Sequence, residues 1–215
     1  MAPRTGGELV VDSLLAHGAT HVFGVPGESF LPILDALHDV GEHLTFVTCR
    51  QEGGAAYMAE AHGKLAGRPG IALVTRGPGA CNAAIGIHTA AQDSTPMVVL
   101  VGQIDTESVD REAFQEIDYR RMFGSVAKWS AQVDRAERIP EYLSRAFVTA
   151  MSGRPGPVVL ALPEDVLATR AAAADLPRAS PVDAAPTDAD VRAAHALLAD
   201  ASRPQALQGQ QEHLL

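Results

Sequence analysis

Short apolar runs alternate with longer amphipathic segments along most of the chain. In the longer segments the apolar residues recur at helical spacing, as in Leu31, Leu34 and Leu37. Thr5 and Glu8 form a capping-box pattern before a first helix, and Gly18 ends it. Further helices are predicted at residues 30–40, 51–66, 81–91 and 139–151. Strands are predicted at residues 21–25, 44–49, 71–75, 97–101, 126–129 and 158–162. Strands alternating with helices are typical of a mainly parallel sheet covered on both faces, so we expect a three-layer α/β/α fold.

The pattern changes after residue 162. Prolines recur among alanines up to Thr187, which is typical of a linker. Residues 188–199 then predict a new helix, capped by Thr187 or Asp188, and the last residues have no helix or strand pattern. We therefore expect one domain over residues 1–165, a linker over 166–187 and the incomplete start of a second domain over 188–215.

Composition excludes several classes of function. The chain has 215 residues, 47% of them hydrophobic, and 17 basic against 26 acidic residues give a net charge of −9. Without clustered Lys and Arg, a nucleic-acid or anionic membrane surface is not expected. No apolar segment predicts a signal peptide or a membrane span, so we expect a cytoplasmic protein. Cys49 and Cys81, both expected in apolar surroundings, and the scattered histidines have no metal-ligand spacing.

Three loops that follow predicted strands contain the unusual residues, at 22–30, 49–56 and 75–82. Parallel sheets bind ligands at the carboxyl ends of their strands, where these loops lie. Gly77-Pro78-Gly79 allows a ligand to approach the backbone closely, but the loop on its own favours an ordinary tight turn. Neither a dinucleotide-binding glycine fingerprint nor a P-loop is present. The pattern therefore indicates where to look, without indicating a ligand.

Glu52 begins a predicted helix directly after a strand. A glutamate there can simply complement the helix dipole, worth about 0.3–1 kcal/mol. The two glycines that follow, Gly53 and Gly54, weaken this interpretation because each costs a helix about 0.8–1 kcal/mol relative to alanine. Both glycines are explained if a ligand must approach the backbone at this turn.

Together, these segments resemble the amino-terminal, pyrimidine-binding domain of thiamine-diphosphate enzymes related to acetolactate synthase. The resemblance covers residues 5–165, and the order and spacing of its motifs are more specific than any single motif. The motifs are Val22-Phe-Gly-x-Pro-Gly27, Arg50-x-Glu-x-Gly-Ala-Ala-x-Met-Ala-Glu60, Gly67-Arg-Pro-Gly70, Thr75-x-Gly-Pro-Gly-x-x-Asn82, Asp93-Ser-x-Pro96, Gly102-Gln103, Ala113-Phe-Gln-Glu116 and Gly153-Arg-Pro-Gly-Pro-Val158.

The resemblance implies that thiamine diphosphate is the cofactor and that Glu52 is the catalytic residue. In this family the glutamate hydrogen-bonds N1′ of the aminopyrimidine and favours its imino tautomer, whose nitrogen removes the C2 proton of the thiazolium. The activated carbon then attacks a 2-oxo acid, and the thiazolium acts as an electron sink for decarboxylation. The implied cofactor-binding residues are Pro26, Gly27, Glu52, Gly77, Pro78, Gly79, Asn82 and Gln115.

Other family positions suggest further contacts. Glu28 and Lys128 match positions near the substrate, and Ser94 and Arg154 match positions that touch FAD in flavin-containing members. FAD is therefore a candidate cofactor only if the chain is of the flavin type. Mg²⁺ and the diphosphate are held in this family by a carboxy-terminal Gly-Asp-Gly and Asn-Asn pair, and neither motif occurs in this sequence.

Three hypotheses about function remain open at this point. We expect a truncated piece of an acetolactate-synthase-like carboligase or decarboxylase, and the resemblance does not imply that it is active alone. The alternatives are a subunit of a split enzyme and a non-catalytic binding module, the latter disfavoured by the presence of Glu52, Asn82 and Gln115. The expected partners are a second copy of the chain or a chain with the diphosphate-binding domain. Either would dock on an apolar face near residues 83–91 and Met58.

Overall fold

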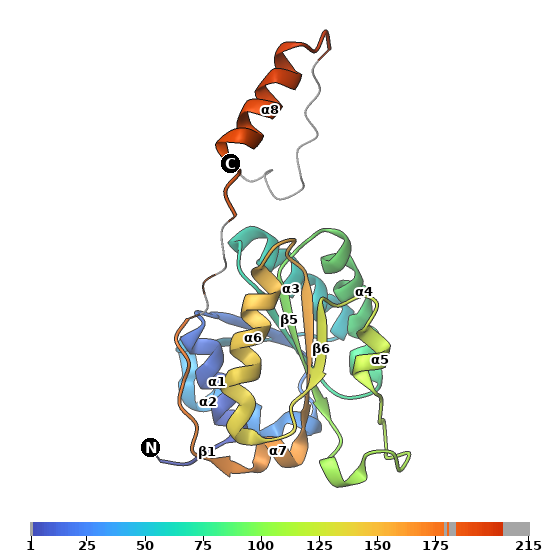
Figure 1. Ribbon diagram of the computed structural model, residues 1–215. Helices are drawn as coiled ribbons and strands as arrows, with labels where there is room; N and C mark the ends of the chain where they lie inside the picture. Colours follow the sequence, from blue (N-terminus) through green and yellow to red (C-terminus); the bar gives the residue numbers. More distant parts are fainter. Residues whose placement is uncertain (1, 179, 181–183, 204–215) are drawn as a thin grey trace.

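A six-stranded, all-parallel sheet forms the centre of the molecule in a computed structural model that describes residues 2–178, 180 and 184–203 (Figure 1). The order of its strands across the sheet is β3-β2-β4-β5-β7-β6. The strands are β2 (His21–Gly24), β3 (Thr45–Thr48), β4 (Gly70–Val74), β5 (Met97–Gln103), β6 (Trp129–Gln132) and β7 (Pro157–Pro163). The central strands β4, β5 and β7 are buried along their whole length, as parallel strands covered on both faces must be.

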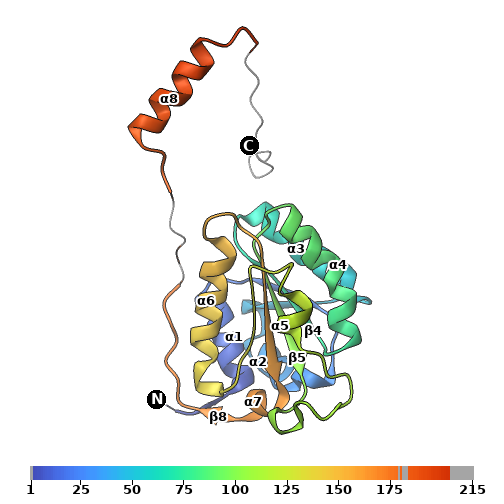
Figure 2. The same ribbon diagram turned by 45° about the vertical axis from the view of Figure 1, so that its right-hand side comes forward.

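Helices cover both faces of this sheet, which confirms the predicted three-layer α/β/α architecture (Figure 2). One face packs against α1 (Gly6–Ala16), α2 (Leu31–Val40) and α6 (Ile139–Met151). The other packs against α3 (Glu52–Ala66), α4 (Pro78–Gln92) and α5 (Tyr119–Phe123). Successive strand residues alternate between the two cores, so that Leu73 and Leu100 belong to the first and Val74 and Val101 to the second.

Helix α1 shows how directly the local sequence specifies the start of the fold. The Thr5 hydroxyl accepts a hydrogen bond from the backbone of Glu8, and the Glu8 carboxylate accepts one from the backbone of Thr5. This reciprocal capping box is the predicted one. Gly18 follows the helix with φ +81°, a left-handed conformation that favours glycine.

The ordered structure continues past the strand that ends at Pro163. Helix α7 (Glu164–Ala168) buries Val166 and Leu167 in the first core, and β8 (Arg170–Ala171) pairs antiparallel with β1 (Arg4–Thr5). Residue 165, where we expect the domain to end, therefore lies inside α7. The division into domain, linker and second domain stays a prediction.

Two expectations from the sequence were wrong in detail. The strand expected at 126–129 is β6, at Trp129–Gln132, because the amides of Val126 and Ala127 instead bond to Phe123 O in a turn after α5. Cys81, expected in apolar surroundings, is exposed on α4, whereas Cys49 is buried. Four short 3₁₀ turns complete the described elements, at Glu28–Phe30, Gly41–His43, Thr106–Ser108 and Ala136–Arg138.

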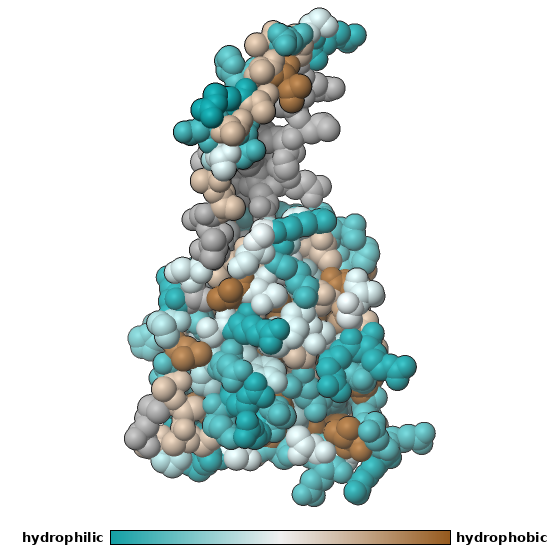
Figure 3. All heavy atoms as spheres, viewed as in Figure 1, coloured by the Kyte–Doolittle hydropathy of each residue, from teal (hydrophilic) through white to brown (hydrophobic). Residues whose placement is uncertain are grey.

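Helix α8 (Asp188–Ala199) occupies the predicted position, and Thr187 caps it through a second capping box with Asp190. It buries none of its residues, and Val191, Leu197 and Leu198 are exposed. Figure 3 shows apolar side chains, in brown, on the visible face of this helix. The segment Gln208-Gly-Gln-Gln-Glu212, at the end of the expected second domain, lies outside the described residues. Within the ranges that the structure describes, no helix is long and apolar enough to cross a membrane.

Candidate functional site

The chain reverses its direction of travel across the sheet between β2 and β4. From β2 it moves outward to β3, and from there it returns to the opposite side of β2 and continues through β4 to β5. Open α/β sheets bind ligands at such a switch point, outside the carboxyl ends of the strands. The loops that follow β2, β3 and β4 are the three that the sequence singles out, and they end up at this one edge.

The loops after β2 and β4 touch each other at the switch point. A Cβ added to Gly27 would lie 2.7 Å from the Cβ of Thr75, so only glycine allows the loop after β2 to come this close to the Thr75 side chain. Ser29 and Thr75 share a hydrogen bond of 2.8 Å between their hydroxyl oxygens. Pro26 is exposed in the same loop as Gly27. These contacts hold the predicted cofactor loop after β2 against the loop after β4.

Glu52 is the first residue of α3 and is half-buried. Its Oε2 accepts a hydrogen bond from the side-chain amide of Asn82 at 2.9 Å. Its Oε1 faces Gly79, where an added Cβ would lie 3.5 Å away. Across the residues that the structure describes, Glu52 forms no ion pair. The carboxylate is therefore oriented by an amide, without a cation to neutralise it.

The two glycines after Glu52 have different surroundings. A Cβ on Gly53 would meet the Gln51 side chain at 2.8 Å and the Asn82 carbonyl at 3.2 Å, so Gly53 serves the packing of α3 against α4. A Cβ on Gly54 would meet nothing within 4 Å. The amide of Gly54 donates to the side chain of Gln51, the N-cap of α3. Only Gly54 therefore fits the idea that the backbone is kept open for a ligand.

The loop after β4 is pinned to the segment around Gln115. Gly77 has φ +58°, and a Cβ added to it would lie 2.7 Å from the Cβ of Gln115, so Gln115 packs directly over it. The amide of Gly77 donates to the buried Tyr119 hydroxyl at 2.8 Å. Burial raises the pKa of Tyr119 to about 12, so this hydroxyl stays neutral at physiological pH. Pro78 and Gly79, with the same loop, begin α4.

Arg76 links several loops at the carboxyl edge of the sheet. It does not stand out in the sequence. It is 7% exposed, and its guanidinium pairs with Glu28 after β2 and Glu164 after β7. Its Nε donates to the carbonyl of Phe114, directly before Gln115. An arginine between a buried strand and a glycine turn is a weak sequence signal for such a network. Its acidic partners are 48 and 88 residues away in the sequence, too far to pair by inspection.

Comparison with known proteins shows the family to which the chain belongs. Residues 4–122 match the model of the family described as "Thiamine pyrophosphate enzyme, N-terminal TPP binding domain". The chain belongs to this family. Similar proteins include the acetolactate synthase isozyme 3 large subunit of Escherichia coli, 48% identical over 78% of this chain, and the acetolactate synthase of Bacillus subtilis, 39% identical over 78%. The mitochondrial acetolactate synthase catalytic subunit of Aspergillus candidus is 42% identical over 85%. The chain spans 29%, 29% and 25% of the length of these relatives, respectively.

Three residues predicted from the thiamine pyrophosphate family lie at the opposite edge of the sheet. Arg154, before β7, donates to the hydroxyl of Ser94, before β5, at 2.7 Å. Lys128 precedes β6 and donates to the carbonyls of Thr149 and Ser152 at the end of α6, and burial lowers its pKa. The structure thus brings Ser94 and Arg154 together, but it brings neither them nor Lys128 to the loops around Glu52.

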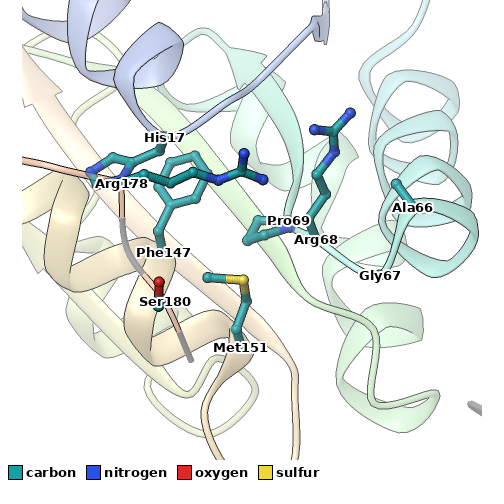
Figure 4. Close-up of a pocket in the computed structure, with 9 residues that line it drawn as sticks. All are labelled: His17, Ala66, Gly67, Arg68, Pro69, Phe147, Met151, Arg178 and Ser180. Carbon is teal, nitrogen blue, oxygen red and sulfur yellow. The ribbon is translucent and has the colours of Figure 1, made fainter. Parts of the chain in front are cut away.

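Two pockets flank this thiamine pyrophosphate domain at its two edges. One of about 490 Å³ is lined by Gln115 and residues of the segment 110–116, next to the Gly77 loop. Another of about 600 Å³ lies at the amino edge of the sheet, where His17, Arg68 and Arg178 surround Phe147 and Met151 (Figure 4). The Glu52 carboxylate lines neither pocket.

Proposed function

We propose that the loops around Glu52 bind the aminopyrimidine ring of thiamine diphosphate and that Glu52 activates it. The observation that carries this proposal is the Glu52 carboxylate, oriented by Asn82 and without a counter-ion among the described residues. A carboxylate in this state can share a proton with a ring nitrogen, because its charge is not already neutralised. Added Cβ atoms at Gly77 and Gly79 would meet Gln115 and Thr75, so these glycines shape the wall beside Glu52, and the open backbone position is Gly54.

The residues present fit the pyrimidine end of this cofactor. One carboxylate oxygen is engaged by Asn82, and the other faces the Gly79 turn. The surface beside Gly54 is open, so a ligand can reach the start of α3. An exchangeable proton on a ring nitrogen is the natural partner of such an acid. The donor set thus matches an aminopyrimidine better than a phosphate, which needs cationic or amide donors.

When bound, thiamine diphosphate supplies an acidic carbon and an electron sink for reactions of 2-oxo acids. In the proposed site, Glu52 holds a proton at the pyrimidine nitrogen, and Asn82 keeps its carboxylate in the required orientation. The turns at Gly27 and Gly77 form the walls of the ring site, and Pro26, Pro78 and Gly79 belong to the same turns. Gln115, packed over Gly77, stands at the side from which a substrate would enter.

We further propose that this domain serves an acetolactate-synthase-like carboligase or decarboxylase. The similar proteins are named acetolactate synthases, and the chain covers about a quarter of their length. In this proposal Mg²⁺ and the diphosphate are held by residues on another domain or chain, because no Gly-Asp-Gly motif occurs in this sequence. A subunit that pairs with a separate chain carrying that motif is the alternative. FAD, if the protein is of the flavin type, would involve Ser94 and Arg154.

The surface formed by α3 and α4 is the proposed contact with that other domain or a second copy. Tyr57, Met58 and Ile85 are 42%, 40% and 56% exposed on it, and Leu65 extends it along α3. Ala83 and Ile87, which we expected to contribute, are buried between the helices instead. An exposed row of large apolar side chains is costly in water and is typical of a surface that docks a partner.

Glu52→Gln tests the proposal on the 215-residue chain, with Glu42→Gln, an exposed glutamate on a 3₁₀ turn, as the matched control. The probes are thiamine diphosphate with Mg²⁺ and the free pyrimidine, 4-amino-5-hydroxymethyl-2-methylpyrimidine, which needs no diphosphate site. Backbone amide shifts of residues 52–54, 77 and 79 are recorded by NMR during each titration. We expect shifts in the wild type and in Glu42→Gln and a marked loss in Glu52→Gln. A wild-type chain in which neither probe moves these amides would refute the proposal.

A further inference from the structure

Arg76 connects the four loops at the carboxyl edge of the sheet. Its own loop follows β4, and its partners lie after β2 (Glu28), β5 (Phe114) and β7 (Glu164). We propose that Arg76 is a positioning residue, which holds the Phe114–Gln115 turn over Gly77 and fixes Glu28 at the rim of the site. This inference rests on the proposed function in that it takes these loops as the cofactor site.

Each arm of the guanidinium is used. Nη1 bonds to Glu164 at 3.1 Å, Nη2 bonds to Glu28 at 2.5 Å, and Nε bonds to the Phe114 carbonyl at 3.3 Å. The Arg76 side chain is 8% exposed, whereas those of Glu28 and Glu164 are 71% and 42% exposed. A rigid, planar guanidinium presents several fixed donors from three nitrogen atoms and can hold acceptors that lie far apart, whereas a lysine offers its donors from a single nitrogen.

The bond to Phe114 acts on Gln115 through the backbone. Gln115 has φ +65°, and Asp110 and Glu112 in the same segment have φ +63° and +55°. Non-glycine residues adopt this conformation at a cost, and it persists only where the surroundings enforce it. Glu116 enforces it from one side by accepting the amides of Asp110 and Ala113. Arg76 enforces it from the other side, at the peptide that carries Gln115.

The same guanidinium sets the charge at the rim. Glu28 and Glu164 face one shared cation, so the three groups together carry one net negative charge. Without Arg76, two carboxylates would stand around a buried position with no cation between them, and the Glu28 side chain would lose its bond to the guanidinium. Because Glu28 lies directly after Gly27 on the cofactor loop, its release would also change that wall of the site.

The test uses the 215-residue chain and three variants. Arg76→Met removes the charge and all donors, and Arg76→Lys keeps the charge but loses the fork. Arg138→Met is the matched control, because Arg138 also bonds two carboxylates, Asp134 and Glu141, which lie after β6 and on α6 and not in the loops that Arg76 joins. The order of Gln115 is read from its ¹⁵N heteronuclear NOE, and the affinity for thiamine diphosphate with Mg²⁺ is read from amide shifts. Both are measured at a temperature at which each variant is fully folded.

We expect Arg76→Met to lower the NOE of Gln115 and to weaken cofactor binding about tenfold, equivalent to the loss of one good contact. Arg76→Lys should show the same loss of Gln115 order and of cofactor affinity. If Arg76 acted only through its charge, the lysine variant would keep both. Arg138→Met should change neither reading. Order and affinity that survive in both Arg76 variants would overturn the inference and leave the proposed function intact.

Two further outcomes are also decisive. If the wild-type chain does not respond to thiamine diphosphate, the proposed function fails, and the NOE of Gln115 alone decides whether Arg76 positions this turn. If Arg76→Met does not fold, Arg76→Lys carries the test, because retained order of Gln115 in that variant would overturn the inference.

Discussion

Asn82 donates a hydrogen bond from its side-chain amide to the carboxylate of Glu52, over 2.9 Å and from one helix to the next. The two residues are 30 positions apart in the sequence and meet because α3 and α4 pack side by side on one face of the sheet. The bond leaves the second carboxylate oxygen facing the Gly79 turn. Asn82 therefore orients Glu52 without neutralising it.

Replacing Asn82 should weaken cofactor binding more than folding. Asn82→Ala removes one exposed hydrogen bond to a charged group, so we expect a loss of about 1 kcal/mol or less in stability and a several-fold loss in thiamine diphosphate affinity. Asn82→Asp should weaken binding further, because two carboxylates would then compete for one proton. Thermal unfolding and NMR titration measure the two effects. An Asn82→Asp variant that binds as tightly as the wild type would contradict this role.

The pair Gly53 and Gly54 offers a contrast between packing and access. Gly54→Ala places a methyl group in open space within a helix, so we expect a gain of about 0.5–1 kcal/mol in stability. Gly53→Ala meets the Asn82 carbonyl and the capping side chain, so it should lose stability instead. If the cofactor approaches at Gly54, the stabilised variant should also bind it less tightly. Denaturant unfolding and NMR titration of both variants test this.

We expect the titration of the Tyr119 hydroxyl to lower the stability of the folded protein at high pH. Its pKa is raised in the folded state to about 12, so the stabilisation of its neutral form is fully present below pH 10, the ordinary value. It is lost as the pH rises from 10 to 12, by about 2–3 kcal/mol at the two-unit shift. Tyr119→Phe should lack this loss, although it costs about 1–3 kcal/mol at pH 8 by leaving the Gly77 amide unpaired.

Denaturant unfolding of both proteins at pH 8, 10 and 11.5 separates this contribution from the titration of other groups. The difference in free energy of unfolding between wild type and Tyr119→Phe should shrink as the pH rises. A constant difference would mean that Tyr119 has an ordinary pKa in the folded protein.

We expect the protonation of two histidines, His17 and His62, to lower the stability of the folded protein at low pH. The pKa of His62 is lowered by burial and by the nearby charges of His21 and Arg68, and that of His17 by burial and Arg178. A lowered folded pKa means that the unfolded chain binds the proton more readily, so stability present above pH 6.5 falls as the pH drops below it. His62→Gln should make the melting temperature less sensitive to pH between 7.5 and 5.5. His43→Gln, an exposed control, should not.

The predictable part of the fold is the part with strong periodicity. The sheet, its three layers and the caps of α1 and α8 follow from apolar runs and from Thr5 and Thr187. The prediction for β6 began three residues too early. The strand is a half-buried edge strand, Trp129-Ser-Ala-Gln132, and the apolar Val126 before it belongs to a turn. Helix α7 was missed because Pro163 begins a proline-rich stretch, yet Val166 and Leu167 still reach the core.

At the candidate site, the sequence indicated the loops but not the links between them. Glu52 and Gly77 stand out because a lone acid and a glycine turn follow predicted strands, whereas Asn82 is implied by the family resemblance. Arg76 does not, because the partners of a buried arginine are set by which strands lie side by side. The order of the strands, which places β4 between β2 and β5, is what brings Glu28 and Phe114 within its reach.

The two-residue ladder between β1 and β8 fixes where the backbone enters and leaves this unit. Arg4 pairs with Ala171 and Thr5 with Arg170, and Arg4 also bonds to Asp12 and Asp175. Entry and exit are therefore one strand spacing apart. The α/β domain could accordingly be inserted into a loop of a host protein without distorting the sheet. It could also be circularly permuted, with its two ends joined by a few residues and new termini placed at an exposed turn such as the one at Gly153.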